Sequence, residues 1–149
     1  SASAPPSGGA SPYAGTTGDL SGTISASTGV AAVHEAESQI GKPYQWGAAG
    51  PDTYDCSGLV MWAYGQVGVH LDHWTGFQWN EGAHVATSQL QPGDLLFFAY
   101  NTSDASTIHH VGMYIGNGQM VEAPYTGANV RISSSNRPDY IGAVRPYQR

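Results

Sequence analysis

Apolar side chains recur at helical spacing in the first half of the chain. Val30, Val33 and Ile40 fall on one side of a helix with alanines between them, and Gly41 and Pro43 follow as stop signals. This pattern predicts a short first helix that begins at about Val30.

A second helical pattern begins near Asp55, a residue type whose side chain caps the free N–H groups of a helix start. The pattern runs through Cys56 as far as Gly68 and is apolar on nearly every side. Because a helix without a polar face is normally buried, we expect this second helix to lie in the core.

Beyond residue 90 the spacing of apolar positions changes from near four to two, with turn residues between the segments. Such alternation is typical of β-strands. Helices followed by antiparallel strands indicate an α+β fold, in which N-terminal helices pack on an antiparallel β-sheet. The predicted strands are residues 95–100, 110–116, 119–123, 129–133 and 141–147.

Residues 1–29 differ from the rest in composition. They are rich in Ser, Gly, Ala, Thr and Pro and contain almost no large apolar side chains, so they cannot form a core of their own. We interpret them as a linker or tail and residues 30–149 as a single domain. We hypothesise that this tail lies against the domain instead of moving freely.

The charge of the chain excludes some partners. A formal net charge of −6 with only five Lys and Arg does not suit a nucleic-acid surface or an anionic membrane, because both need basic side chains. We see no apolar run long enough to span a bilayer and no signal peptide at the start, so we interpret the chain as mature or trimmed. The small share of charged residues, 11%, favours a secreted protein.

Cys56 is the only cysteine of the chain, so it forms no internal disulfide. It stands at the predicted first turn of the buried helix, where free N–H groups and the helix dipole favour a thiolate. This position suits a nucleophile. A buried structural cysteine is the alternative interpretation.

A cysteine nucleophile needs an imidazole as base and a third group that orients the imidazole. The chain has six histidines, and His110 differs from the others because it opens a predicted hairpin around Gly116, Asn117 and Gly118. Glu122, on the second strand of this hairpin, is the candidate for the third group. Without a histidine partner it would be interpreted as a solvent-exposed strand carboxylate.

The register of the hairpin decides whether His110 and Glu122 meet. A two-residue turn would place Glu122 opposite Met113, on the other face of the sheet from His110. A three-residue loop, residues 116–118, places Glu122 opposite Gly112 and on the same face as His110. We therefore predict the three-residue loop, which also directs a set of apolar side chains to the core face: Val111, Met113, Ile115, Val121 and Ala123.

Four sequence motifs together resemble the NlpC/P60 cysteine peptidases, particularly the secreted endopeptidases of mycobacteria and other actinobacteria, which use a glutamate as the third catalytic residue. The resemblance covers residues 30–147, with 54 positions from Cys56 to His110 and 12 more to Glu122. The motifs are Tyr44-Gln45-Trp46-Gly47, Asp55-Cys56-Ser57-Gly58, Pro92-Gly93-Asp94-Leu95 and the hairpin from His110 to Glu122.

The resemblance implies a papain-like α+β fold and a peptidoglycan hydrolase. If the chain follows the pattern of this family, Cys56 is the nucleophile, His110 the base and Glu122 the third residue of a catalytic triad. The bond cleaved would join the γ-carboxyl of D-glutamate to meso-diaminopimelate in peptidoglycan stem peptides. No metal or organic cofactor is implied, and we expect a secreted or cell-wall monomer that binds neither nucleic acid nor membrane.

Other residues near the nucleophile are candidates for oxyanion or substrate binding. The Cys56 backbone N–H and the Tyr44 hydroxyl would hold the oxyanion, unless Tyr44 is a packed core aromatic. Asp55 and Ser57 would bind the stem peptide, unless both are helix caps. In the predicted loop 73–79, Trp74 and Gln78 would line the substrate groove, where packing of the aromatics is the alternative.

Three further interpretations stay open from the sequence. One is a CHAP-like N-acetylmuramoyl-L-alanine amidase, which shares the order of cysteine and histidine. Another is a catalytically silent peptidoglycan-binding module. The last is a zinc enzyme, although no HExxH or CxxC spacing is found; its ligands would be drawn from His70, His73, His109 and His110.

Relatives are often made with a preceding segment that lies over the active-site cleft. Residues 1–29 are the candidates for such a segment here, and Pro5, Pro6, Pro12 and Tyr13 would stiffen it.

Overall fold

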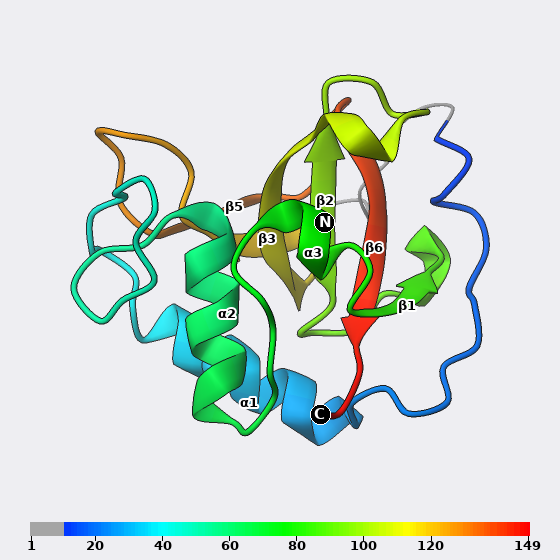
Figure 1. The fold of residues 1–149 in the computed structure, drawn as a ribbon, viewed down its shortest axis with the longest axis horizontal. Helices are drawn as coiled ribbons and strands as arrows, with labels where there is room; N and C mark the ends of the chain where they lie inside the picture. The colour runs from blue at the N-terminus through cyan, green and yellow to red at the C-terminus, as the bar shows by residue number, and fades with distance from the viewer. Residues whose placement is uncertain (1–10) are drawn as a thin grey trace.

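The computed structural model describes residues 11–149 and combines helices with an antiparallel six-stranded sheet in the order β1-β6-β2-β3-β4-β5 (Figure 1). The predicted α+β fold is confirmed. None of the helices within the described residues is long and apolar enough to cross a membrane. The elements are α1 (Ala26–Glu37), α2 (Cys56–Gln66), α3 (Thr75–Gln78), β1 (Gly82–Val85), η1 (Thr87–Gln89), β2 (Leu95–Ala99), η2 (Ala105–Thr107), β3 (Ile108–Gly116), β4 (Gln119–Glu122), β5 (Arg131–Ser134) and β6 (Tyr140–Pro146).

Helix α1 begins at Ala26, four residues before the predicted start at Val30. The side chain of Ser25 caps the helix by accepting a hydrogen bond from the backbone N–H of Thr28 at 3.2 Å. The first turn contains only small residues, so the spacing of apolar side chains did not reveal it. The cap, and not the first apolar residue, sets the start of α1.

Helix α2 is buried, as its apolar circumference predicts, and packs on α1 and β3. Asp55 caps it, with Oδ1 accepting a hydrogen bond from the backbone N–H of Gly58 at 2.7 Å. A β-carbon on Gly58 would come within 2.1 Å of the carbonyl oxygen of Ala48. Glycine at this position therefore lets the loop before α2 lie directly against the helix start.

The apolar core has two parts, one on each face of the sheet. The larger part lies between the helices and the sheet, and it includes Leu59 of α2, Val111 and Met113 of β3, and Val121 of β4. The smaller part covers the opposite face. Its buried members are Val85, Leu96, Phe98, Tyr114, Met120, Tyr140 and Ala143.

Residues 11–25 lie along β1 and β6, at the side of the sheet away from α2 (blue in Figure 1). The N–H of Gly18 donates to the carbonyl of His84 at 2.9 Å, and the N–H of Ile24 donates to that of Pro146 at 2.9 Å. The segment thus covers β1, an edge strand too short for the alternation pattern to predict. Pro5 and Pro6, part of the predicted cleft cover, lie outside the described residues.

The register of the β3–β4 hairpin agrees with the prediction, but its turn does not. Met113 pairs with Val121, which sets Glu122 opposite Gly112. Gly116 pairs with Gln119, so the turn has two residues, Asn117 and Gly118, both with positive φ. A β-bulge between Tyr114 and Gly116 supplies the extra residue. The predicted three-residue loop is therefore wrong, because a bulge shifts the register equally well.

Candidate active site

Cys56 is the first residue of α2, and its side chain is partly exposed in a cavity of about 220 Å³. As the first residue of the helix it has a backbone N–H with no helical carbonyl to accept it, and the positive end of the helix dipole lies at the same point. The other residues in the cavity wall are Tyr44, Trp46, Asp55, Ser57, Trp74, Thr75, Ile108 and His109.

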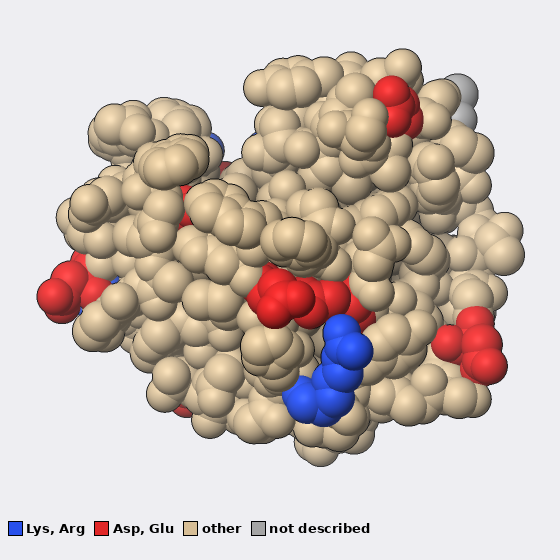
Figure 2. All heavy atoms as spheres, in the orientation of Figure 1, with Lys and Arg blue, Asp and Glu red and all other residues tan. Residues whose placement is uncertain are grey.

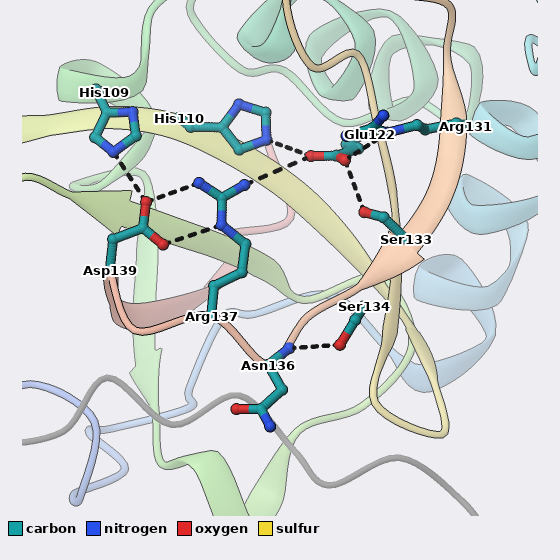
Figure 3. A network of polar contacts seen from close by, with 9 residues as sticks. All are labelled: His109, His110, Glu122, Arg131, Ser133, Ser134, Asn136, Arg137 and Asp139. Atoms are coloured by element: carbon teal, nitrogen blue, oxygen red, sulfur yellow. Dashed lines mark hydrogen bonds and ion pairs between the residues drawn. The ribbon is translucent and has the colours of Figure 1, made fainter.

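His110 of β3 and Glu122 of β4 form a buried pair (Figure 3). Nε2 of the imidazole lies 2.7 Å from Oε1 of the carboxylate, and the two residues are 5% and 1% exposed. The shared face that the hairpin register predicts for them is therefore observed. Glu122 is not the solvent-exposed carboxylate that its residue type alone would favour.

The Glu122 carboxylate has partners on both oxygens. Oε2 accepts hydrogen bonds from Nε of Arg131 at 3.1 Å and from Oγ of Ser133 at 2.7 Å (Figure 3). Burial raises the pKa of Glu122, but hydrogen bonds from His110, Ser133 and Arg131 and the charge of His110 outweigh burial and lower the pKa to about 2. Glu122 is therefore an anion at neutral pH.

The same contacts favour the charged form of His110. Burial lowers its pKa, but hydrogen bonds to Cys56 and Glu122 and the negative charges of both groups raise it to about 9. Because Nε2 faces Glu122, Nδ1 is the nitrogen that can exchange a proton with the thiol of Cys56. This arrangement can hold an imidazolium beside a thiolate.

Tyr44 and Cys56 line the wall of the same cavity. Burial and the negative charges of Cys56 and Asp55 raise the pKa of its phenol. The hydroxyl therefore keeps its proton at neutral pH and is able to donate a hydrogen bond. The side chain also packs partly against the core, so both interpretations of Tyr44 describe its environment.

Asp55 connects the start of α2 to two neighbouring segments. Besides capping Gly58, its carboxylate accepts a hydrogen bond from the N–H of Gly47 at 3.0 Å and lies 2.7 Å from Nε2 of His73. Ser57 is buried, with Oγ 3.4 Å from Oδ1 of Asp55. The contacts of Asp55 match the capping interpretation, whereas Ser57, the second residue of α2, donates to Asp55 and is not the cap. Both residues also line the cavity of Cys56.

Trp74 lines the cavity of Cys56 and is the middle one of three neighbouring rings, between His73 and the more exposed Trp46. Its ring stacks on His73 at 4.5 Å between centroids and lies 5.8 Å from that of Trp46. The segment predicted as a loop contains the short helix α3. Trp79, at the end of this segment, is instead buried in the core.

Gln78 is fully buried, so its side chain does not reach the cavity in this structure. Its Nε2 donates hydrogen bonds to the carbonyls of Ser57 at 3.0 Å and Asp72 at 2.9 Å. This geometry does not fit the predicted contact with substrate. Gln78 instead holds the first turn of α2 against the loop that precedes α3.

Arg131, Ser133 and His73 contact the site, but sequence reasoning did not assign them these roles. Arg131 and Ser133 stand two positions apart, so alternation could have placed both on one face of a strand. It could not reveal that this strand pairs with β4 and sets Arg131 opposite Glu122. His73 reaches Asp55 from a distant loop, and no local pattern signals this contact.

One group within residues 11–149 has the spacing of a metal site. Ligand atoms of His70, Asp72 and Glu81 lie within 4.8 Å of one another, and Arg149 lies 3.5 Å from Glu81. His70 is the only histidine of the zinc interpretation in this group, and none of its residues lines the cavity of Cys56. Other charged side chains on this side of the molecule are few and mostly acidic (Figure 2).

Comparison with known proteins agrees with the geometry. The chain is 42% identical over 128 residues to the peptidoglycan endopeptidase RipA of Mycolicibacterium smegmatis, covering 77% of this chain and 24% of RipA. It is 46% identical over 96 residues to a probable endopeptidase p60 of Listeria grayi, covering 64% and 18%. The chain thus spans less than a quarter of the length of these two relatives.

A solved structure shows the same fold. The crystal structure of an NlpC/P60 family protein from Bacillus cereus superposes with a TM-score of 0.75 at 32% identity, covering 87% of this chain and 42% of the other. The sequence model of the NlpC/P60 family matches residues 41–145, which include Cys56, His110 and Glu122. The chain therefore belongs to the NlpC/P60 family.

Proposed function

We propose that the protein is a cysteine endopeptidase that hydrolyses the bond between the γ-carboxyl of D-glutamate and meso-diaminopimelate in peptidoglycan stem peptides. The observation that carries this proposal is the buried pair of His110 and Glu122. Because Nε2 of His110 faces Glu122, Nδ1 of the same ring remains available to Cys56 at the start of α2. The reaction class is supported by the similarity to RipA, a peptidoglycan endopeptidase, and to p60, a probable endopeptidase. A secreted or cell-wall location follows from such a substrate.

In the acylation step, the Cys56 thiolate attacks the γ-carbonyl carbon, and His110 donates its Nδ1 proton to the leaving amine as the carbon–nitrogen bond breaks. The backbone N–H of Cys56 and the hydroxyl of Tyr44 stabilise the oxyanion. Glu122 keeps the imidazole oriented and stabilises its cation. The products are a free amine and a thioester on Cys56.

In the deacylation step, His110 removes a proton from water, and the resulting hydroxide attacks the thioester carbonyl. The carbon–sulfur bond breaks, the acid product leaves, and the ion pair of Cys56 and His110 forms again. The mechanism uses side chains and one backbone N–H of this chain together with water, and it requires no metal or organic cofactor.

Product analysis tests the proposal. The native protein is incubated with a muropeptide that carries the stem L-alanyl-γ-D-glutamyl-meso-diaminopimelyl-D-alanine, and the products are identified by mass. We expect cleavage after D-glutamate. Release of the whole stem from the lactyl group would instead identify an N-acetylmuramoyl-L-alanine amidase, and binding without cleavage would identify a silent wall-binding module.

A further inference from the structure

A second cavity, of about 260 Å³, lies beside the catalytic pair. His110 forms part of its wall, and His109 belongs to the walls of both this cavity and the cavity of Cys56. The two hollows therefore adjoin at β3, with the nucleophile in one and the imidazole in the other. The remaining residues in the wall of the second cavity are Pro124, Tyr125, Arg131 and Arg137.

Two positively charged side chains line this second cavity, although the protein as a whole is acidic. Two of the five Lys and Arg residues of the chain, Arg131 and Arg137, line it. Their side chains are 44% and 34% exposed, whereas the side chain of Glu122 between them is 1% exposed. The guanidinium groups are therefore accessible from the cavity, whereas the carboxylate that both contact is buried. Figure 3 shows both arginine side chains directed at this carboxylate.

Arg131 has the donors that a carboxylate needs. Its hydrogen bond to Glu122 uses Nε, so that carboxylate does not engage the two terminal nitrogens. The guanidinium also lies over the ring of Tyr125, 5.4 Å from the centroid, which restrains its plane. Arg137 differs, because its Nε and one terminal nitrogen are already bound to Asp139 at 3.0 and 2.7 Å.

The direction of the proposed reaction sets which half of the substrate meets this cavity. His110 must reach the leaving amine to protonate it, so the amine-side amino acid lies next to the imidazole, which forms part of the cavity wall. Diaminopimelate carries a second carboxylate at the far end of its side chain, and lysine is the same amino acid without this group. Arginine binds a carboxylate through two parallel hydrogen bonds.

We propose that the cavity of Arg131 and Arg137 binds the distal carboxylate of the leaving diamino acid, with Arg131 as the direct ligand. This inference rests on the proposed function and adds a specificity-determining residue to it. The enzyme would thereby distinguish diaminopimelate stems from stems that end in a neutral or cationic side chain.

The test compares two stem tripeptides that differ only at the distal centre of diaminopimelate, one with the carboxylate and one with the carboxamide. We expect the native protein to have a kcat/KM roughly 10- to 100-fold higher for the carboxylate, which is the range for a charge-assisted pair. In Arg131→Gln this ratio falls to near one.

Ser133→Ala is the matched control, because Ser133 also donates to Glu122 but does not line the cavity. We expect it to lower both rates alike and to preserve the native ratio. A native ratio near one, or an unchanged ratio in Arg131→Gln, would overturn the assignment of the carboxylate site while leaving the proposed function standing. Cleavage of neither tripeptide by the native protein would overturn the proposed function and this assignment together.

Discussion

Glu122→Gln tests the negative charge of Glu122, the third residue of the proposed triad, without changing the size of its side chain. The carboxylate is 1% exposed and contacts His110, Arg131 and Ser133. Glutamine has the same size, so the variant keeps the packing of β4 but removes the negative charge beside Nε2 of His110. The expected effect on catalysis is therefore electrostatic.

The size and direction of the effect follow from the contacts of His110. Its pKa is raised from 6.5 to about 9, so the imidazolium, which in the proposed mechanism protonates the leaving amine, exists below about pH 9 and is lost above it. A hydrogen bond to a charged group contributes about 1.5–3 kcal/mol, which corresponds to roughly a 10- to 100-fold loss in kcat/KM. Without Glu122, the alkaline limit of activity should also move from about pH 9 toward lower pH.

The assay is the pH dependence of kcat/KM for cleavage of a stem tetrapeptide by the native protein and by Glu122→Gln. Glu35→Gln on α1 is the control, because it removes the same charge at a residue that lines neither the cavity of Cys56 nor that of His110. Thermal unfolding checks that all three proteins are folded. An alkaline limit at the same pH in Glu122→Gln and the native protein would refute the electrostatic role of Glu122.

Three other changes test the fold around the site. Gly58→Ala should lower both the melting temperature and activity, because the new β-carbon would lie 2.1 Å from the carbonyl oxygen of Ala48; thermal unfolding and hydrolysis rates check this. Arg145→Leu should lower the free energy of unfolding by about 3–5 kcal/mol in urea titrations, because it leaves the buried carboxylate of Asp94 without its ion pair. Deletion of residues 1–25 should lower the melting temperature without raising the hydrolysis rate, because residues 11–25 cover β1 and line neither active-site cavity.

The elements that position the site could be predicted where the spacing of apolar residues along the sequence also determines which side chains are buried. The apolar circumference of α2 indicated a buried helix, and Asp55 indicated its start. The register of β3 and β4 could also be predicted, because only one register sends Val111 and Val121 to the core and brings Glu122 to the face of His110. Local sequence was sufficient in these cases because the burial of apolar side chains, the helix cap and the shared face of His110 and Glu122 all favoured the same arrangement.

Other features depend on contacts between distant segments, which a local pattern does not carry. The position of Arg131 opposite Glu122 results from the pairing of β4 with β5. The contact of His73 with Asp55 joins residues from separate loops. Gln78 shows the opposite error: its place beside an aromatic segment suggested contact with substrate, whereas its side chain is fully buried against Ser57.

The central claim is that Cys56, activated by His110, cleaves the stem peptide at D-glutamate. Its most direct test is the rate of release of L-alanyl-D-glutamate from a tetrapeptide stem by the native protein and by Cys56→Ala, with both shown to be folded by thermal unfolding. We expect release by the native protein and none above background by the variant. Release at comparable rates by both proteins would contradict the claim that Cys56 is the nucleophile.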